Sequence, residues 1–183
     1  MSRLIVISAP SGAGKTTLCR RLLSDFKNLT LSISSTTRAP RGTEKDGVEY
    51  YFITRGEFEK GIEAEEFAEW ARVHDNLYGT SKKTIERAFQ NGKDVLLDID
   101  VQGAESLRKA YPNEALTIFI SPPSLEILEK RLRDRKTDSE ASIQKRMQNA
   151  REEMQAIPHF DHVIVNDDLE KAYAELKRIV SNG

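Results

Sequence analysis

Short apolar runs recur along the chain and are separated by longer amphipathic stretches. The runs are rich in β-branched residues and do not alternate with polar residues, which is typical of strands buried on both faces. They span residues 4–7, 31–33, 95–97, 116–120 and 163–165. Helical periodicity lies at about residues 17–26, 81–90, 101–110, 124–135, 139–155 and 168–180. Strands that alternate with helices predict an α/β fold of three layers, with a five-stranded parallel sheet covered on both sides.

Two stretches do not fit this alternation and are predicted to form separate lobes. Residues 34–80 are rich in Arg, Glu, Tyr and Gly and are expected to carry short strands of their own. Residues 122–151 form two charged helical segments with eight basic residues. These are Lys130, Arg131, Arg133, Arg135, Lys136, Lys145, Arg146 and Arg151. Thr137 followed by Glu140 predicts a capping box at the start of the second segment.

Composition narrows the class of protein without specifying a function. The 183 residues suffice for one compact domain with small inserted lobes. Charged residues make up 31% of the chain, but the net charge is −1, so no basic excess indicates nucleic acid. The single Cys19 excludes a disulfide framework. No apolar run could cross a bilayer, and no signal peptide precedes the first strand. We expect a cytoplasmic protein without a nucleic-acid or membrane partner, and the sequence leaves a homo-oligomer open.

The strongest chemical signal is a glycine loop directly after the first predicted strand. Residues 8–17 read Ser-Ala-Pro-Ser-Gly-Ala-Gly-Lys-Thr-Thr and lead into a helical pattern. A strand, a glycine loop and Gly-Lys-Thr at a helix start are typical of the phosphate-cradling P-loop. Glycines let successive backbone N–H groups turn toward one anion, and the helix N-terminus adds free donors and a favourable dipole. The competing interpretation is an ordinary glycine turn.

Within this loop, Lys15 is expected to reach the outer phosphates of a nucleotide, and the Thr16 hydroxyl can ligate Mg²⁺. Ala9 stands where the usual pattern has its first glycine. The residues assigned to the nucleotide are Ala9, Pro10, Ser11, Gly12, Ala13, Gly14, Lys15, Thr16 and Thr17.

A second series of motifs follows the P-loop. The series consists of Thr36-Thr37-Arg38-Ala39-Pro40-Arg41, Glu44, Gly47, Tyr50, Phe52, Glu69, Tyr78-Gly79-Thr80 and Asp98-Ile99-Asp100-Val101-Gln102-Gly103. In this order behind a P-loop, it closely resembles guanylate kinases, over nearly the whole chain. The resemblance implies transfer of a phosphoryl group from ATP, with Mg²⁺, to GMP and also dGMP. It further implies a P-loop core (1–33, 81–121 and 156–183), an inserted GMP-binding lobe (34–80) and a helical lid (122–155).

The residue types in this series suit a guanine nucleotide on chemical grounds. Arg38 and Arg41 suit a phosphate monoester. Neutral donors to the same phosphate are Ser34, Tyr50 and Tyr78. Guanine presents two N–H donors beside the O6 acceptor, so Glu69 can accept both N–H groups while the Thr80 hydroxyl donates to O6. Adenine would leave Glu69 unpaired in a desolvated pocket, and penalties of that kind reach roughly 10⁴-fold.

Each of these residues also has a plainer interpretation. Arg38 and Arg41 could be surface charges, and Glu69 could be a solvent-facing strand residue. Asp100 could be a hydrogen-bonding residue at a strand end. The charges around Arg133 are typical of a solvated helix face, since opposite charges recur there at i,i+4.

The resemblance assigns roles to further residues. Lys15, Arg41, Arg135 and Arg146 would stabilise charge on the migrating phosphoryl group. On the ATP side it implies contacts from Arg131, Asn166 and Asp167. On the GMP side it implies Glu44, Gly79, Asp98 and Asp100, with Asp98 near the water shell of the metal.

Three other functions compete with this interpretation. A GTPase-type switch would fit Asp100-Val101-Gln102-Gly103, but its Asn-Lys-x-Asp motif is missing. A non-catalytic binding module related to guanylate kinases typically loses Gly-Lys-Thr, which is intact here. A P-loop kinase for another small phosphate ester would not be expected to combine Glu69 with Tyr78-Gly79-Thr80.

Overall fold

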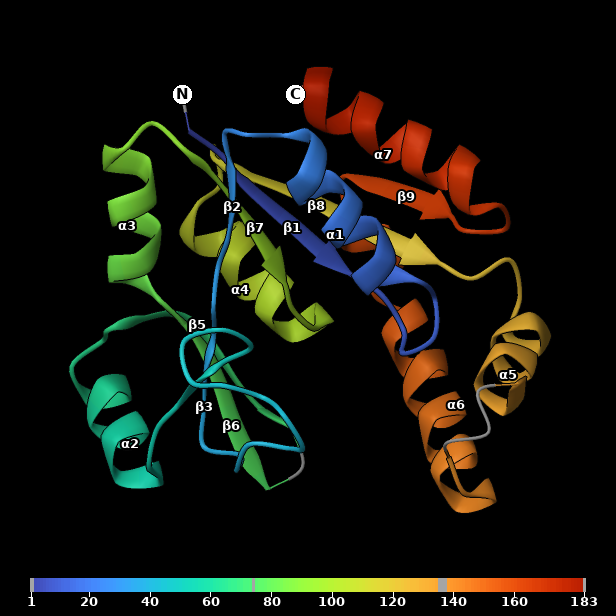
Figure 1. Ribbon diagram of the computed structural model, residues 1–183, viewed down its shortest axis with the longest axis horizontal. Helices are drawn as coiled ribbons and strands as arrows, with labels where there is room; N and C mark the ends of the chain where they lie inside the picture. Colours follow the sequence, from blue (N-terminus) through green and yellow to red (C-terminus); the bar gives the residue numbers. More distant parts are fainter. Residues whose placement is uncertain (1, 74, 135–137, 183) are drawn as a thin grey trace.

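A five-stranded parallel sheet forms the centre of the computed structural model, which describes residues 2–73, 75–134 and 138–182 (Figure 1). Its strands are β1 (Leu4–Ser8), β2 (Leu29–Leu31), β7 (Asp94–Asp98), β8 (Ala115–Ser121) and β9 (His162–Val165), in the order β2-β7-β1-β8-β9. All five predicted strands are present, and the second lies at 29–31 rather than at 31–33. The fold class predicted from the sequence is confirmed.

Helices cover both faces of this sheet, as the non-alternating strands require. Side chains of β1 point alternately to the two faces, and Leu4 to Ile7 are fully buried. Ile5 and Ile7 pack with α1 (Lys15–Asp25) and α7 (Leu169–Asn182). Leu4 and Val6 pack with α3 (Lys82–Gln90) and α4 (Val101–Ala110). Burying one such side chain contributes about 1.5–3 kcal/mol, so β1 anchors both halves of the core.

A smaller mixed sheet lies beyond the carboxyl ends of the central strands (Figure 1). It contains β3 (Ser35–Thr36), β4 (Tyr51–Phe52), β5 (Phe67–Val73) and β6 (Asn76–Ser81), in the order β4-β3-β6-β5. The register of the β5–β6 pair shifts between Phe67 and Glu69, as in a β-bulge. The shift places Glu69 directly opposite Thr80, with both side chains buried.

Helix α2 (Arg55–Glu63) supports the smaller sheet. It begins with a capping box in which the Thr54 hydroxyl accepts from the Glu57 N–H and the Glu57 carboxylate accepts from the Thr54 N–H. Phe58 of α2 stacks on Phe67 of β5, with ring centroids 4.3 Å apart. This contact fixes the strand on which Glu69 lies.

Helices α5 (Leu125–Asp134) and α6 (Glu140–Met154) form a separate pair, on the opposite side of the sheet ends from the smaller sheet (Figure 1). They share a small apolar core. The described part of α6 begins at Glu140 with Ser139 as N-cap, and the capping box predicted at Thr137 stays a prediction. Thr137 itself lies outside the described residues.

The 3₁₀-helix η1 (Ile157–His159) joins α6 to β9. Every predicted helix is present within two residues of its expected bounds, over the residues that the structure describes. The three ranges expected for core, lobe and lid stay a prediction. In the same described residues, the structure holds no helix of the length and apolarity that a bilayer crossing needs.

Candidate active site

The loop between β1 and α1 has the backbone that a P-loop requires. Gly12 and Gly14 have φ values of +101° and +96°, a left-handed region that side chains disfavour. Gly14 is the N-cap of α1 and supplies no side-chain cap. The first N–H groups of the helix therefore lack an intrahelical acceptor and are suited to bind an anion.

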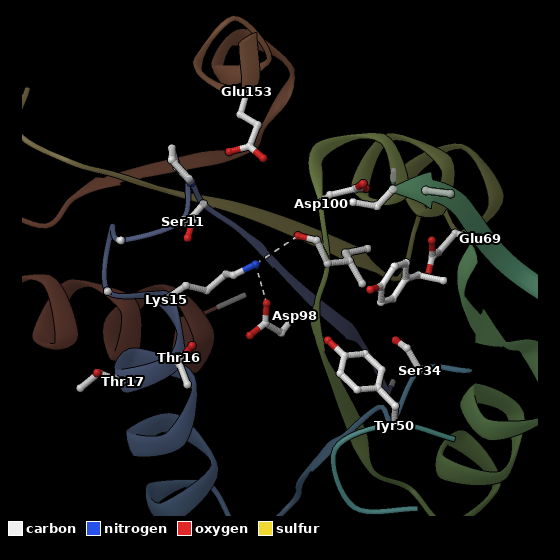
Figure 2. Close-up of a pocket in the computed structure, with 18 residues that line it drawn as sticks. Ser11, Lys15, Thr16, Thr17, Ser34, Tyr50, Glu69, Asp98, Asp100 and Glu153 are labelled. Atoms are coloured by element: carbon white, nitrogen blue, oxygen red, sulfur yellow. Dashed lines mark hydrogen bonds and ion pairs between the residues drawn. The ribbon is translucent and has the colours of Figure 1, made fainter. Parts of the chain in front are cut away.

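Lys15, the first residue of α1, extends toward the carboxyl end of β7. Its Nζ lies 2.5 Å from Asp98 Oδ1 and 3.5 Å from the backbone oxygen of Ile99 (Figure 2). The Ser8 hydroxyl donates to the same Ile99 oxygen at 2.8 Å, which ties the ends of β1 and β7 together. The described structure thus pairs the ammonium of Lys15 with a carboxylate.

A cleft of about 470 Å³ joins the P-loop to the smaller sheet (Figure 2). The predicted residues on its wall are Ala9, Pro10, Ser11, Gly12, Gly14, Lys15, Thr16, Thr17, Ser34, Tyr50, Glu69, Tyr78, Asp98 and Asp100. Residues predicted as two separate groups, one around the P-loop and one in the lobe, therefore face a single cleft.

Glu69 is the buried carboxylate of this cleft, with only 6% of its surface exposed. The Thr80 hydroxyl donates to Glu69 Oε1 at 2.6 Å. Burial, opposed by the Thr80 bond and reinforced by the nearby Asp100, raises the pKa of Glu69 to about 7. The plainer interpretation of Glu69 as a solvent-facing strand residue is therefore wrong. Gly79 is also buried, but its Cα faces the Phe58 and Phe67 rings.

Asp100 has a structural role as the N-cap of α4. Its Oδ1 accepts from the Gly103 N–H at 2.8 Å, which satisfies one of the free donors of the first turn. Its side chain also faces the cleft (Figure 2). The plainer interpretation of Asp100 as a hydrogen-bonding residue at a strand end agrees with this contact.

The two predicted phosphate-binding arginines lie apart from the cleft wall. Arg38 is buried and donates to Glu44 Oε1 at 2.9 Å and to the Ala39 oxygen at 2.8 Å. Its guanidinium lies 5.4 Å from the centroid of the Tyr50 ring. The Arg41 side chain is exposed, and its backbone N–H donates to Glu44 Oε2 at 2.7 Å. The bond from Arg38 lowers the pKa of Glu44.

Helices α5 and α6 both contact the P-loop side of the cleft. Arg146 of α6 donates to the Ser11 hydroxyl and lies 3.2 Å from Asp138. Arg131 of α5 donates to the backbone oxygen of Asn166 at 2.9 Å. The Arg135 prediction lies outside the described residues.

Asn166, at the end of β9, connects this helix pair to the phosphate loop. Its Nδ2 donates to the backbone oxygen of Ala13 at 2.6 Å, while its own backbone oxygen accepts from Arg131. The neighbouring Asp167 is exposed.

Sequence reasoning missed Glu153, in the last turn of α6. Its half-buried side chain lines the cleft and lies across from Ser11 (Figure 2). Burial raises its pKa to about 7, opposed by Lys15 and reinforced by Asp100. The signal that could have found it is spacing, because Glu153 follows Arg146 by two helical turns and shares its face.

The fold and the cleft together define a P-loop nucleotide-binding protein, with an α/β core and added lobes on either side of the phosphate loop. A family model described as guanylate kinase matches residues 1–183. The chain belongs to the guanylate kinase family.

Individual relatives agree with this assignment. The chain is 51% identical to a guanylate kinase of Carboxydothermus hydrogenoformans and 47% identical to one of Campylobacter jejuni strain RM1221, each over 178 residues. Both alignments cover 97% of this chain and 87% of the relative. A crystal structure of guanylate kinase from Anaplasma phagocytophilum superimposes with a TM-score of 0.79 at 33% identity, covering 98% of this chain and 85% of that one. The family resemblance predicted from the sequence is confirmed.

Proposed function

We propose that this guanylate kinase transfers the γ-phosphoryl group of ATP to GMP, and also to dGMP, giving ADP and the nucleoside diphosphate. The observation that supports this most directly is the single cleft with the P-loop at one end and the buried Glu69 at the other. ATP bound through its phosphates at the P-loop and GMP bound through its base at Glu69 would bring the γ-phosphate of ATP and the phosphate of GMP together between the two ends.

At the P-loop end, the backbone N–H groups and Lys15 would bind the ATP phosphates. Lys15 would exchange its bond to Asp98 for phosphate oxygens. Asn166 holds the phosphate loop in place through its bond to the Ala13 backbone oxygen. Together with Asp167, it would lie beside the adenine of ATP.

Mg²⁺ fits this end of the cleft. The Thr16 hydroxyl and the Asp98 carboxylate both face it. No group of three or more His, Cys, Asp or Glu side chains is placed to hold a metal ion in the described part of the chain. Such a sparse donor set suits a cation that keeps several waters and binds through substrate phosphates. When bound, Mg²⁺ would neutralise phosphate charge; Thr16 would hold it directly and Asp98 through water.

At the opposite end, Glu69 would accept the N1 and N2 hydrogens of guanine. Charge-assisted bonds to a buried carboxylate are about twice as strong as neutral ones. The Thr80 hydroxyl donates its only hydrogen to Glu69. The predicted bond from Thr80 to O6 would therefore require this hydroxyl to rotate when GMP binds.

The GMP phosphate would be bound by Arg38 and Arg41, with Ser34, Tyr50 and Tyr78 as neutral donors. Glu44 contacts both arginine residues and would fix their segment. The exposed Arg41 would have to move inward, so this part of the site would be completed by closure of the lobe.

Transfer would need positioning and charge stabilisation but no general base. An oxygen of the GMP phosphate is already anionic near neutral pH and would form the new bond to the γ-phosphorus. The bond from that phosphorus to the bridging oxygen would break, and its electron pair would leave with ADP. Lys15, Arg41, Arg135 and Arg146 would stabilise the charge on the transferred group.

The test is ADP formation from MgATP with GMP, dGMP, AMP, CMP and UMP as acceptors. GMP and dGMP should be preferred over AMP by at least 10³-fold in kcat/KM, because adenine leaves Glu69 unpaired and such discrimination reaches roughly 10⁴-fold. A binding module would form no ADP with any acceptor. Equal use of AMP and GMP would contradict the proposed substrate.

A further inference from the structure

Gly103, in the first turn of α4, packs directly against the carboxylate of Glu69. A Cβ atom placed on Gly103 would lie 2.8 Å from Glu69 Oε2, which is closer than real Cβ contacts. It would also lie 3.2 Å from Ile99 Cδ1 and 3.3 Å from Asp100 Oδ1. The two oxygens of Glu69 therefore have different surroundings: Thr80 binds Oε1, and the surface of Gly103 bounds Oε2.

The backbone does not explain why this residue is a glycine. Gly103 lies in a helix and is not among the residues with positive φ. Glycine is a poorer helix former than alanine, so it weakens α4 at this position. The remaining structural reason is the space that a side chain would take from Glu69.

We infer that Gly103 is a positioning residue for guanine recognition: its missing side chain leaves room for the Glu69 carboxylate to lie where both of its oxygens can accept from guanine. This inference rests on the proposed function, because it assigns Gly103 to the selectivity for GMP.

A methyl group at position 103 would act mainly on Glu69. All three near neighbours are ends of side chains, which can move without displacing the backbone. Glu69 Oε2 is the nearest and must shift the most. A carboxylate turned away from position 103 would strain its 2.6 Å bond with Thr80 before GMP binds, and it would lose its alignment with the two N–H groups of guanine once GMP is bound.

The experiment compares Gly103→Ala with wild type for both GMP and AMP. The expected result is a fall of about tenfold or more in kcat/KM for GMP, carried mostly by KM, since one charge-assisted bond is misaligned. AMP does not use the carboxylate, so its kcat/KM should change far less and the GMP/AMP ratio should narrow. Gly56→Ala is the matched control, because a Cβ there would meet nothing within 4 Å.

A double-mutant cycle separates positioning from a general structural role. In a Glu69→Ala background there is no carboxylate to displace, so Gly103→Ala should cause no further loss with GMP. An equal loss in both backgrounds would overturn the inference. A Gly103→Ala protein that does not fold would overturn it too, because the argument requires that only side-chain ends move.

The remaining outcomes separate the inference from the proposed function. If wild type does not prefer GMP over AMP, the proposed function fails and the inference fails with it. If wild type prefers GMP and folded Gly103→Ala keeps the same ratio, only the inference fails.

Discussion

Lys15 and Asp98 form an ion pair whose partners both face the nucleotide end of the cleft. The mutation Lys15→Ala should lower kcat by at least about 10²-fold, because it removes a charge that stabilises the transferred phosphoryl group. Steady-state ADP formation under saturating substrates measures this loss. Lys177→Ala is the control, since Lys177 also forms an ion pair, with Asp25, but remote from the cleft. A folded Lys15→Ala protein with near-normal turnover would refute the role of Lys15.

Glu69 should make GMP binding depend on pH. Only the ionised carboxylate accepts both N–H groups of guanine, and burial raises its pKa to about 7. Protonation therefore weakens binding as pH falls, and the ionised fraction drops about tenfold between pH 8 and pH 6. We expect the Kd of GMP, measured calorimetrically, to rise by a similar factor over that range.

Two variants identify the group responsible for this pH dependence. Glu69→Gln should bind GMP more weakly at pH 8, by about 1.5–3 kcal/mol, and should keep only the smaller pH dependence of the GMP phosphate, whose second pKa is about 6. Glu153→Gln should keep it, although burial also raises the pKa of Glu153 to about 7. A wild-type Kd that stays constant from pH 8 to pH 6 would show that guanine does not depend on Glu69 ionisation.

Residue types predicted much of the site, but individual contacts were beyond the sequence. Glu69 and Thr80 could be paired by their complementarity to guanine. Their hydrogen bond depends on the register shift in β5, and the space for Glu69 depends on Gly103 of a distant helix. Both are non-local features that no local pattern encodes. For the same reason, the sequence predicted the contact of Arg133 within its own helix but not its contact with the next helix.

Among the helices, α2 depends for its stability on the capping box in its first turn. Thr54→Ala should remove the capping box and lower the free energy of unfolding by about 1 kcal/mol, while kcat changes little. Urea denaturation measures the change. Ser81→Ala is a matched control, because Ser81 is the N-cap of α3 but makes no side-chain cap bond. Equal destabilisation by both substitutions would show that the Thr54 hydroxyl bond is not the cause.

In the helix pair α5–α6, the sequence predicts the contacts within each helix but not those between the two helices. The i,i+4 bond between Arg133 and Glu129 follows from helical spacing, and it is present at 2.7 Å. Arg133 also binds Glu140 of the next helix through both carboxylate oxygens. The sequence predicts each helix from its own periodicity, but the angle between two helices depends on the shared core and on such bridges.

In the whole molecule, the groups proposed to surround the phosphates lie on opposite sides of the sheet ends. Arg38 and Arg41 belong to the side of the smaller sheet, and Arg146 belongs to α6 (Figure 1). They can enclose one phosphate chain only if the two sides approach each other. We expect the radius of gyration from X-ray scattering to fall when GMP and a non-hydrolysable ATP analogue bind together.

Each ligand alone should give a smaller change than the pair, because one nucleotide engages one side. Superimposable scattering profiles of the free and doubly liganded protein, at saturating concentrations, would exclude closure. If AMP with the ATP analogue causes the same compaction as GMP with the analogue, closure does not depend on recognition of guanine.

At this scale the sequence predicted the layers but not the order of strands. Buried, non-alternating runs separated by helices indicate a parallel sheet. Which strand lies next to which is set by long-range packing, and β1 pairs with β7 on one side and β8 on the other.

The central place of β1 has a consequence for synthesis on the ribosome. Its two neighbours are not complete until Asp98 and Ser121 have been translated. At about 5–20 residues per second, translation from Ser8 to Ser121 takes roughly 6–23 s, and during this time β1 lacks one or both of the strands that pair with it. The most buried strand of the finished protein is thus an exposed segment of the nascent chain during that interval, when its apolar surface and unpaired edges favour aggregation.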